Sequence, residues 1–497
     1  MKIVTAAILS LACGIIHGQG YNHQWLLGNY NFPQDPKGRM FIDSNNYNII
    51  TEFRKMPFYG TQGNICDANG NFLMSSNGIW IANANNDTMM NGSGLNPGPF
   101  ASGWPYGFPL SSGNLFIPKP GNISNYFLIH QTGSPNQDIP SLEIFSSEID
   151  INLDSGLGEV IAKNIIILQD SLAWGIGACK HANGRDWWIV AMKDSSNIIY
   201  KILIDNAGAS SVTAQSLNFL PIANKTVVQH TFSPDGSKFI SATYDDPVNR
   251  NSFIIIADFD RCTGMFSNTQ TVQLTSGWYL WGLAFSPSGN FAYACSDYHI
   301  FQVDVNTLAV DTVAVYDGFI SPGPSCCPAT FWNMYLAANG KIYVTSGSGI
   351  RHFTEINYPD SAGLACDVQQ HAVFIGNYAH LRAVPSHPNY YLGCDTTLGC
   401  PCLTTDIQSL SPPDFKFRLY PNPVTNGFLN IGYLLPQNKH GVFEIFDVTG
   451  KAVFKYTLPH WSNEQSFKLA GLHSGIYNCV ITSDNKRISK KLAVINE

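Results

Sequence analysis

The feature that most constrains the fold is a hairpin pattern that recurs roughly every 50 to 60 residues. Each copy contains an apolar strand, a tight turn that ends in glycine, and a second apolar strand. In the copy "SPDG", proline fixes φ at the first turn position, aspartate can bond its own backbone, and glycine takes positive φ. A period of this length indicates units that pack side by side. The turn glycines are Gly70, Gly121, Gly184, Gly236, Gly289 and Gly340.

A third and a fourth strand follow the hairpins. The third strands run toward a polar residue, after which a turn leads to another apolar stretch. Four short strands per repeat are typical of one blade of a β-propeller, because neighbouring blades cover the faces that a lone sheet leaves open. The polar residues are Asp150, Asp205, Asp260, Asp304 and Asn357.

The sequence therefore predicts an all-β chain with a β-propeller of about seven four-stranded blades over residues 21–402. A weaker seventh turn near Pro388 completes the count. We expect the strand 24–30 to complete the last blade, whose earlier strands would come from 378–393. A β-sandwich or a solenoid is the alternative, but a sandwich would not keep so regular a period.

Composition and charge indicate an exported protein. Charged residues make up 13% of the chain, about half of the usual ~25%, and Gly and Pro are abundant at 43 and 28. The net charge of −7 argues against nucleic acid as a partner, which usually requires a basic face. Lys2, a short apolar stretch and the small residues near Gly18 predict a signal peptide over residues 1–20. A buried first strand is the alternative.

The composition shifts near the C-terminus. Residues 403–414 are rich in Ser, Thr, Asp and Pro, which predicts a linker. Six or seven short strand candidates then follow within 415–497, with Gly450 in a hairpin turn. This pattern predicts a small β-sandwich.

Four motifs in this last segment are "LYPNP", "FEIFDVTGKAVF", "GLHSGIY" and "KRISKKLAVI". In order and spacing, the segment 415–497 resembles the type A C-terminal sorting domain of the type IX secretion system of Bacteroidota. The alternative is a pilin-like or adhesive β-sandwich. The residues that carry the resemblance are Tyr420, Pro421, Asn422, Pro423, Asp447, Gly450, Lys451, Gly475, Tyr477 and Lys490.

The resemblance implies a route and partners. It implies export to the periplasm, passage across the outer membrane, and contact with the type IX translocon and a sortase. It also implies release outside the cell or attachment to surface lipopolysaccharide. The stretch that begins "NICDANGNFLMSS" resembles gliding-motility-associated surface proteins, which supports fold and compartment but no activity.

The cysteines suggest limited cross-linking. Of 12 cysteines, eleven would remain once Cys13 leaves with the signal peptide. Cys394, Cys400 and Cys402 lie close together and are disulfide candidates, with one disulfide expected among them. A zinc site is disfavoured by the lack of a nearby fourth ligand. We expect no metal and no cofactor.

Two groups of residues are candidates for ligand binding. Polar residues between second and third strands could gather on one face of a propeller, although capping of turns is the simpler explanation. The insertion 91–114 carries aromatic side chains that could stack on a sugar or anchor a protein, or could fold down over the propeller edge. Trp187, Trp188, Trp278 and Trp281 are interpreted as core. The candidates are Asp245, Asp246, Asp297, His299, Arg351 and His352, together with Trp104, Tyr106 and Phe108.

The sequence contains no Gly-x-Ser-x-Gly elbow, no His-Glu-x-x-His motif and no phosphate-binding glycine loop. The favoured function is a secreted or cell-surface binding module for an unknown glycan or protein ligand. Two alternatives stay open. One is a hydrolase or lyase that acts on extracellular polysaccharide or peptide, and the other is a structural component of a surface or adhesion layer.

Overall fold

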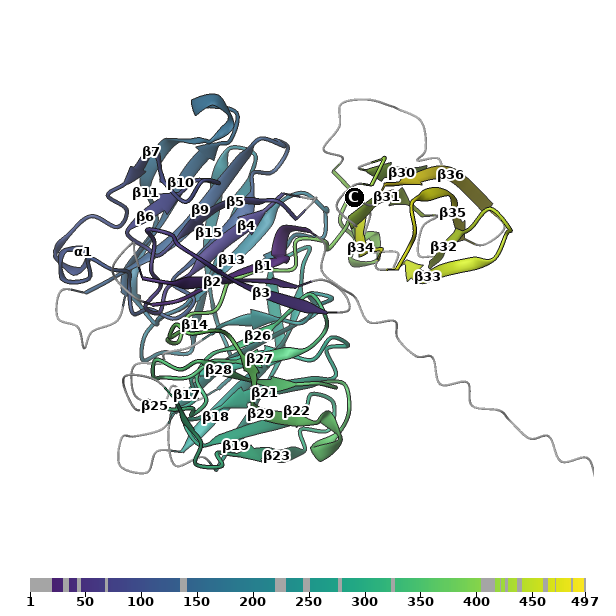
Figure 1. The fold of residues 1–497 in the computed structure, drawn as a ribbon. Coiled ribbons are helices and arrows are strands. Elements are labelled where there is room, and N and C mark those ends of the chain that lie inside the picture. The colour runs from purple at the N-terminus through teal and green to yellow at the C-terminus, as the bar shows by residue number, and fades with distance from the viewer. Residues whose placement is uncertain are drawn as a thin grey trace, which may run out of the picture.

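The computed structural model is an all-β protein with 36 strands, one short α-helix, α1 (Pro99–Gly103), and four short 3-10 helices among the residues it describes (Figure 1). No helix in this part of the chain is long and apolar enough to cross a membrane. The predicted signal peptide and most of the predicted linker lie outside the described residues. The structure describes residues 20–29, 35–42, 46–67, 70–134, 141–219, 229–244, 251–275, 279–322, 327–403, 416–420, 422–424, 428–435, 440–458, 464–469, 471–483 and 486–495.

Seven groups of antiparallel strands follow one another along the described part of residues 24–374, and we call them sheets 1 to 7 in chain order, although sheets 2 and 3 are joined into one eight-stranded sheet. Sheet 1 contains β1 (Gln24–Leu27), β2 (Lys37–Ile42) and β3 (Tyr47–Glu52). Sheet 2 contains β4 (Gly63–Cys66), β5 (Phe72–Ser76), β6 (Trp80–Ala82) and β7 (Thr88–Ser93). Sheet 3 contains β8 (Asn114–Pro118), β9 (Asn125–Gly133), β10 (Ser141–Asp150) and β11 (Glu159–Leu172).

Sheet 4 contains β12 (Gly177–Lys180), β13 (Trp187–Met192), β14 (Ile198–Asp205) and β15 (Gly208–Ser216). Sheet 5 contains β16 (Thr231–Phe232), β17 (Lys238–Tyr244), β18 (Ser252–Asp260) and β19 (Met265–Leu274). Sheet 6 contains β20 (Gly282–Phe285), β21 (Phe291–Cys295), β22 (His299–Asp304) and β23 (Val310–Val315). Sheet 7 contains β26 (Met334–Leu336), β27 (Ile342–Val344), β28 (His352–Ile356) and β29 (Val368–Phe374), and a small pair, β24 (Ile320–Ser321) and β25 (Cys327–Pro328), precedes it.

The turn glycines occupy the positions that the repeat predicts. Each of the six stands between the first and second strand of one sheet, from sheet 2 to sheet 7, and each has a positive φ between 73° and 84°. The aspartates that end the third strands also have a common role. Asp205 Oδ1 accepts a hydrogen bond from the backbone N–H of Ala207 at 2.7 Å, and Asp150, Asp260 and Asp304 make the same contact two residues on.

The seven sheets pack in a closed circle. Sheet 1 packs on sheet 2 around Leu26 and Phe72, and sheets 2, 3 and 4 share one apolar cluster. Further clusters join sheets 4 and 5, sheets 5 and 6, and sheets 6 and 7. The circle closes where Trp25 of sheet 1 stacks on Phe353 of sheet 7, with ring centroids 4.9 Å apart.

The structure departs from the predicted strand arrangement in two places. Sheet 1 has three strands among the described residues, and sheets 2 and 3 are joined by a parallel pairing of β7 with β11. The predicted closure is also wrong. The strand at 24–27 pairs with β2 rather than with 378–393, and the latter segment contains no strand but only an isolated bridge at His380. Pro385 and Pro388 lack the N–H that a strand ladder needs.

Residues 378–395, which we call the axial segment, run through the middle of the circle and bond to one sheet after another. Gly28 N–H of sheet 1 donates to His380 Nδ1 at 3.0 Å. His387 Nε2 donates to the Asn64 carbonyl of sheet 2 at 2.8 Å. Tyr390 OH donates to the Phe116 carbonyl of sheet 3 at 2.9 Å. The segment thereby satisfies its polar groups without forming a ladder.

Two disulfides involve the end of the axial segment and the residues that follow it. Cys262, in the turn between β18 and β19 of sheet 5, pairs with Cys400, and Cys394 pairs with Cys402. All three predicted candidates are therefore bonded, but in two disulfides rather than one. Cys262 was missed because it lies 138 residues away from its partner.

We expect the two disulfides to differ in their contribution to stability. In the chain-entropy model, a bond that closes 138 residues stabilises by about 5 kcal/mol and one that closes 8 by about 2.5 kcal/mol. Replacing Cys262 and Cys400 by Ser should therefore lower the thermal midpoint more than replacing Cys394 and Cys402 by Ser. Differential scanning calorimetry of the two double variants measures this. A larger loss for the 394/402 pair would contradict it.

The C-terminal strands have a core of their own. One sheet contains β30 (Lys416–Tyr420), β31 (Phe428–Leu434) and β34 (Glu464–Lys468). The other contains β32 (Gly441–Phe446), β33 (Ala452–Leu458), β35 (Gly475–Ser483) and β36 (Lys486–Val494). Both sheets contribute to one apolar cluster that includes Phe443 and Phe467, whose rings stack at 5.2 Å. These strands form a separate group in Figure 1.

Candidate functional site

Aromatic side chains gather where the first strands of several sheets begin. Tyr59 precedes β4, Trp281 immediately precedes β20, and Trp332 precedes β26. These three side chains are half-buried. Because the first strands lie side by side around the axis, the residues that enter them meet at one end of the circle.

An arginine of the axial segment lies among these rings. The Arg382 guanidinium carbon is 4.5 Å from the centre of the Trp332 ring and 5.8 Å from that of Tyr59. Trp332 in turn stacks on Trp281, with centroids 3.8 Å apart and planes at 12°. Trp104, from the insertion, lies 5.4 Å from Tyr59. We call these five residues the aromatic–arginine cluster.

The backbone of the axial segment fixes the position of Arg382. Its N–H donates to the Ser346 carbonyl at 2.9 Å. Its carbonyl accepts from Asn333 Nδ2 at 2.9 Å and from Thr345 Oγ1 at 2.8 Å. The residue has a φ of 56°, in the left-handed region that few non-glycine residues adopt. The guanidinium is therefore held at one place and is not at the end of a free loop.

The guanidinium itself has no hydrogen-bond or ion-pair partner among the described residues, and its Nε is a buried donor without an acceptor there. Burial lowers the pKa of Arg382, while Tyr59 and Asp297 act in the opposite direction. A half-buried cation without an anionic partner is costly, so the arrangement favours an anion at this point.

Asp297 lies beside the cluster. Its Oδ2 accepts a hydrogen bond from Trp281 Nε1 at 2.9 Å. Burial raises the pKa of this carboxyl group, and the hydrogen bond from Trp281 and the charge of Arg382 partly offset that effect. Asp297 makes no ion pair among the described residues, so it adds an acceptor close to the stacked rings.

Glycine makes room for the stacked tryptophans. A side chain at Gly347 would place its Cβ 2.6 Å from the Trp332 ring. Such a contact is far shorter than packed atoms tolerate, so the Trp332 ring could not keep its position beside Arg382.

The predicted site residues do not all lie at one place in the structure. Asp297 and Trp104 lie at the cluster, and Tyr106 is 48% exposed. Phe108 is completely buried, which corrects the expectation that it contacts a ligand, because it packs edge-on against Phe100 at 4.9 Å. Asp245 and Asp246 lie outside the described residues.

The other loop candidates do not join the cluster through any described contact. The half-buried His299 ring stacks on Phe301 at 5.7 Å. His352 Nδ1 lies 3.2 Å from Ser321 Oγ, and the Arg351 backbone N–H donates to the same hydroxyl at 2.9 Å. Burial lowers the pKa of His352, and the neighbouring His371 and Arg351 add to this effect.

Sequence reasoning missed Tyr59, Trp332 and Arg382 and placed Trp281 in the core. Trp187 and Trp188 are buried as expected, whereas Trp278 lies outside the described residues. One signal could have found the stacked pair: Trp281 and Trp332 each stand eight residues before the turn glycine of their repeat. Arg382 has no such signal, because the axial segment is not a repeat.

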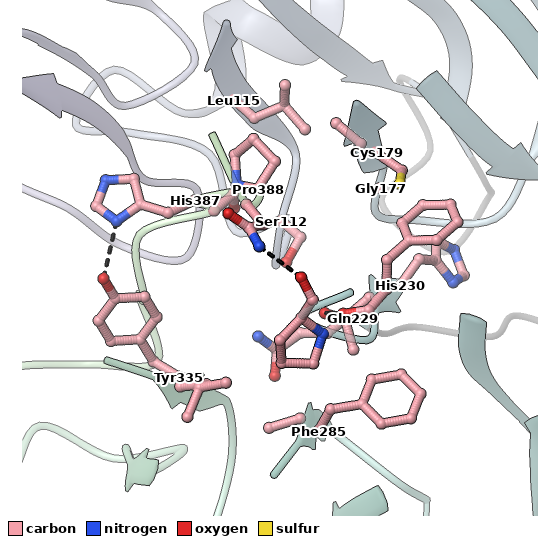
Figure 2. Close-up of a pocket in the computed structure, with 18 of the residues that line it drawn as sticks. Ser112, Leu115, Gly177, Cys179, Gln229, His230, Phe285, Tyr335, His387 and Pro388 are labelled. Carbon is pink, nitrogen blue, oxygen red and sulfur yellow. Dashed lines mark hydrogen bonds between the residues drawn. The ribbon is translucent and has the colours of Figure 1, made fainter. Parts of the chain in front are cut away.

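A cavity of about 160 Å³ lies along the axis. First strands of sheets 3 to 7 and residues 385–389 line it, as Figure 2 shows. The wall carries the hydrogen bond between Tyr335 OH and His387 Nδ1 at 2.9 Å. Among the described residues, no group of three or more His, Cys, Asp or Glu side chains is placed to hold a metal ion.

The axial histidines, the fully buried His380 and the half-buried His387, should make the fold sensitive to acid. Burial lowers the pKa of His380 and His387 to about 4, from an ordinary 6.5. Each Nδ1 accepts a hydrogen bond, so the folded state holds the neutral ring. Between pH 6.5 and about 4, these histidines bind protons in the unfolded chain but stay neutral in the folded protein. Stability should therefore fall as the pH drops from 6.5 towards 4, by roughly 1.4 kcal/mol per pH unit for each ring.

Replacing His387 by Gln tests this origin. The variant should lose less stability than the native protein between pH 7 and pH 5, because its unfolded chain has one fewer histidine that binds a proton. The exposed His473→Gln is the matched control and should keep the native pH dependence. Chemical unfolding at several pH values measures the slopes. Equal slopes in all three proteins would contradict the assignment.

The insertion offers a second test, because two of its aromatic residues differ in burial. Phe108→Ala should lower the free energy of unfolding by roughly 3–5 kcal/mol, since the ring is fully buried. Tyr106→Ala should change it by no more than about 0.5 kcal/mol, since this ring is half exposed. Urea unfolding of both variants measures the difference. Equal losses would show that the insertion does not pack as described.

One comparison with known proteins found a similarity in the C-terminal part. Residues 418–495 match the family model of the secretion system C-terminal sorting domain. This part of the chain is similar to sorting domains. The match supports type IX secretion cargo and a secreted or cell-surface protein that engages the secretion machinery. No curated protein matches the chain.

Several solved structures are distantly similar. An extracellular domain of a putative one-component system from B. thetaiotaomicron has 10% identity and a TM-score of 0.35, over 97% of this chain and 59% of that one. A quinoprotein alcohol dehydrogenase-like protein from Bacteroides thetaiotaomicron has 11% identity and a TM-score of 0.35, over 71% and 83%. Streptogramin B lyase has 10% identity and a TM-score of 0.33, over 73% and 87%. Likenesses at these scores carry no argument, and the resemblance to gliding-motility-associated proteins stays a prediction.

The sorting-motif residues have definite places in this module. Asn422 Nδ2 donates to the Lys491 carbonyl at 2.8 Å, and Asn422 Oδ1 accepts from Ala493 N–H at 2.9 Å, which ties the "PNP" segment to β36. Asp447 Oδ1 accepts from the N–H groups of Thr449 and Lys451, and the Thr449 hydroxyl holds the pKa of this carboxyl group low.

The remaining sorting-motif residues take turn, strand and edge positions. Gly450 has a φ of 83° in the same turn, and Gly475 begins β35. Tyr477 OH donates a hydrogen bond to the His473 carbonyl, and Tyr420 ends β30. Lys490, on β36, and Pro423 are exposed. Pro421 lies outside the described residues. Turn, strand and bridging contacts therefore account for much of the motif.

Proposed function

We propose that the protein is a type IX secretion cargo whose N-terminal part is an extracellular binding module. The observation that carries the binding role is the Arg382 guanidinium, held among aromatic rings without a described partner. The export role depends on the match of residues 418–495 to the sorting-domain family. Cleavage by a sortase and attachment to surface lipopolysaccharide are further parts of this proposal.

The domain organisation belongs to the same proposal. Residues 1–20 are the signal peptide, 21–402 a seven-bladed β-propeller, 403–414 a linker and 415–497 a sorting domain with a β-sandwich fold. Support for the propeller comes from the closed circle of sheets and from the regular place of the six turn glycines. Support for the sandwich comes from the apolar cluster that its two sheets share.

Deletion of residues 415–497 tests the export route. In a bacterium with the type IX system, the shortened protein should accumulate in the periplasm, whereas the full chain should reach the medium or the cell surface. Cell fractionation with immunoblotting measures the distribution. Resistance of the periplasmic product to protease should match that of the full chain, because the ring and the C-terminal strands have separate cores. Normal secretion of the shortened chain would overturn the assignment.

A further inference from the structure

We propose that the aromatic–arginine cluster binds the carboxylate of a uronic acid residue in an acidic polysaccharide. The proposal rests on the proposed binding function and names its ligand class. Arg382 would pair with the carboxylate, and the neighbouring aromatic residues would pack against the sugar ring.

The charge at the cluster selects the anion. Arg382 is half-buried, and its guanidinium has no acceptor among the described residues. A planar guanidinium offers two parallel N–H groups, which match the two oxygens of a carboxylate. The guanidinium carbon lies over the Trp332 ring at 4.5 Å and over the Tyr59 ring at 5.8 Å, and these rings accept no hydrogen bond from its N–H groups in their plane, so the N–H groups stay available to an anion. A bound carboxylate would remove the cost of a half-buried, unpaired cation.

The surroundings of Arg382 favour a saccharide over a simple ion. Tyr59 and Trp104 are half-buried and lie 5.4 Å apart, so part of this aromatic pair next to the arginine is open to a ligand. Aromatic faces take the apolar side of a sugar ring. Asp297 makes one side-chain hydrogen bond, from Trp281, and can accept others from sugar hydroxyl groups. An anion anchor, an aromatic platform and a hydroxyl acceptor together match an acidic sugar.

The axial position of the cluster gives a ligand one direction of approach. The far end of the axial segment is bonded to the turns of sheets 4 and 5, and two disulfides close it. Arg382 stands at the other end, where the first strands begin. A polymer chain that lies across this end can place one acidic residue on the axis.

The experiment measures binding of the purified protein to three polymers. The probes are polygalacturonate, dextran sulfate and neutral dextran, in calorimetry at low and at moderate salt. We expect binding to polygalacturonate that weakens with salt, and no binding to dextran. Stronger binding to dextran sulfate would show that the oxyanion is a sulfate ester and would overturn the uronate assignment.

Variants locate the site. Arg382→Ala should weaken binding to polygalacturonate by about tenfold or more. Arg382→Lys should bind more strongly than Arg382→Ala but more weakly than the native protein, because lysine keeps the charge but lacks the two parallel N–H groups of the guanidinium. Lys119→Ala removes the same charge beside the Gly121 turn, at the opposite end of the circle, and should bind as the native protein does. Circular dichroism melting checks that each variant is folded. Unchanged binding by a folded Arg382→Ala variant would overturn the proposal.

Two further outcomes separate this proposal from the binding function on which it rests. Binding to a neutral glycan or to a peptide carboxylate, but not to polygalacturonate, would overturn the uronate proposal and leave a binding module in place. Failure to bind any member of a broad glycan and protein array would overturn both.

Discussion

The burial of the axial segment is the constraint on which the rest of the structure depends. A chain that crosses the middle of a ring cannot pair with one strand, because the strands diverge around it. Its polar groups therefore need separate hydrogen-bond partners. The side chains of His380, His387 and Tyr390 form hydrogen bonds with the backbone of sheets 1, 2 and 3, respectively. Since those partners exist together only when the circle is closed, the segment and the ring stabilise each other.

The place of the candidate site follows from this arrangement. Three hydrogen bonds hold the backbone of Arg382: its N–H donates to the Ser346 carbonyl, and its carbonyl accepts from the side chains of Asn333 and Thr345. The repeat places Trp281 and Trp332 at equivalent positions on neighbouring sheets. A cation and two rings that come from different parts of the chain are thus positioned by rigid elements. Preorganisation of this kind favours binding, because little conformational entropy is lost when a ligand arrives.

Local patterns in the sequence predicted much of the fold, whereas long-range contacts could not be predicted. The turn at Gly236 requires only four neighbouring residues, so "SPDG" is readable by itself. The path of residues 378–395 depends on contacts with several sheets, and the strands that its apolar residues and weaker turn near Pro388 predict do not form. The disulfide partner of Cys400 is 138 residues away in the sequence, and the spacing of cysteines does not predict such a distant pairing. The same limit hid Arg382, whose role depends on rings from distant repeats.

The two ends of the ring differ in how they hold the axial segment, and this difference bears on the proposed binding role. At the glycine-turn end, Lys180 Nζ donates to the Tyr390 carbonyl and Asp395 N–H donates to the Ala182 carbonyl, so the axial segment is tied to sheet 4. The disulfide from Cys262 to Cys400 adds a covalent bond to sheet 5. At the other end, the Arg382 guanidinium, which has no ion-pair or hydrogen-bond partner among the described residues, lies beside half-buried aromatic rings. In the proposed binding module, a ligand would therefore approach the axis from the arginine end and would place its negative charge there.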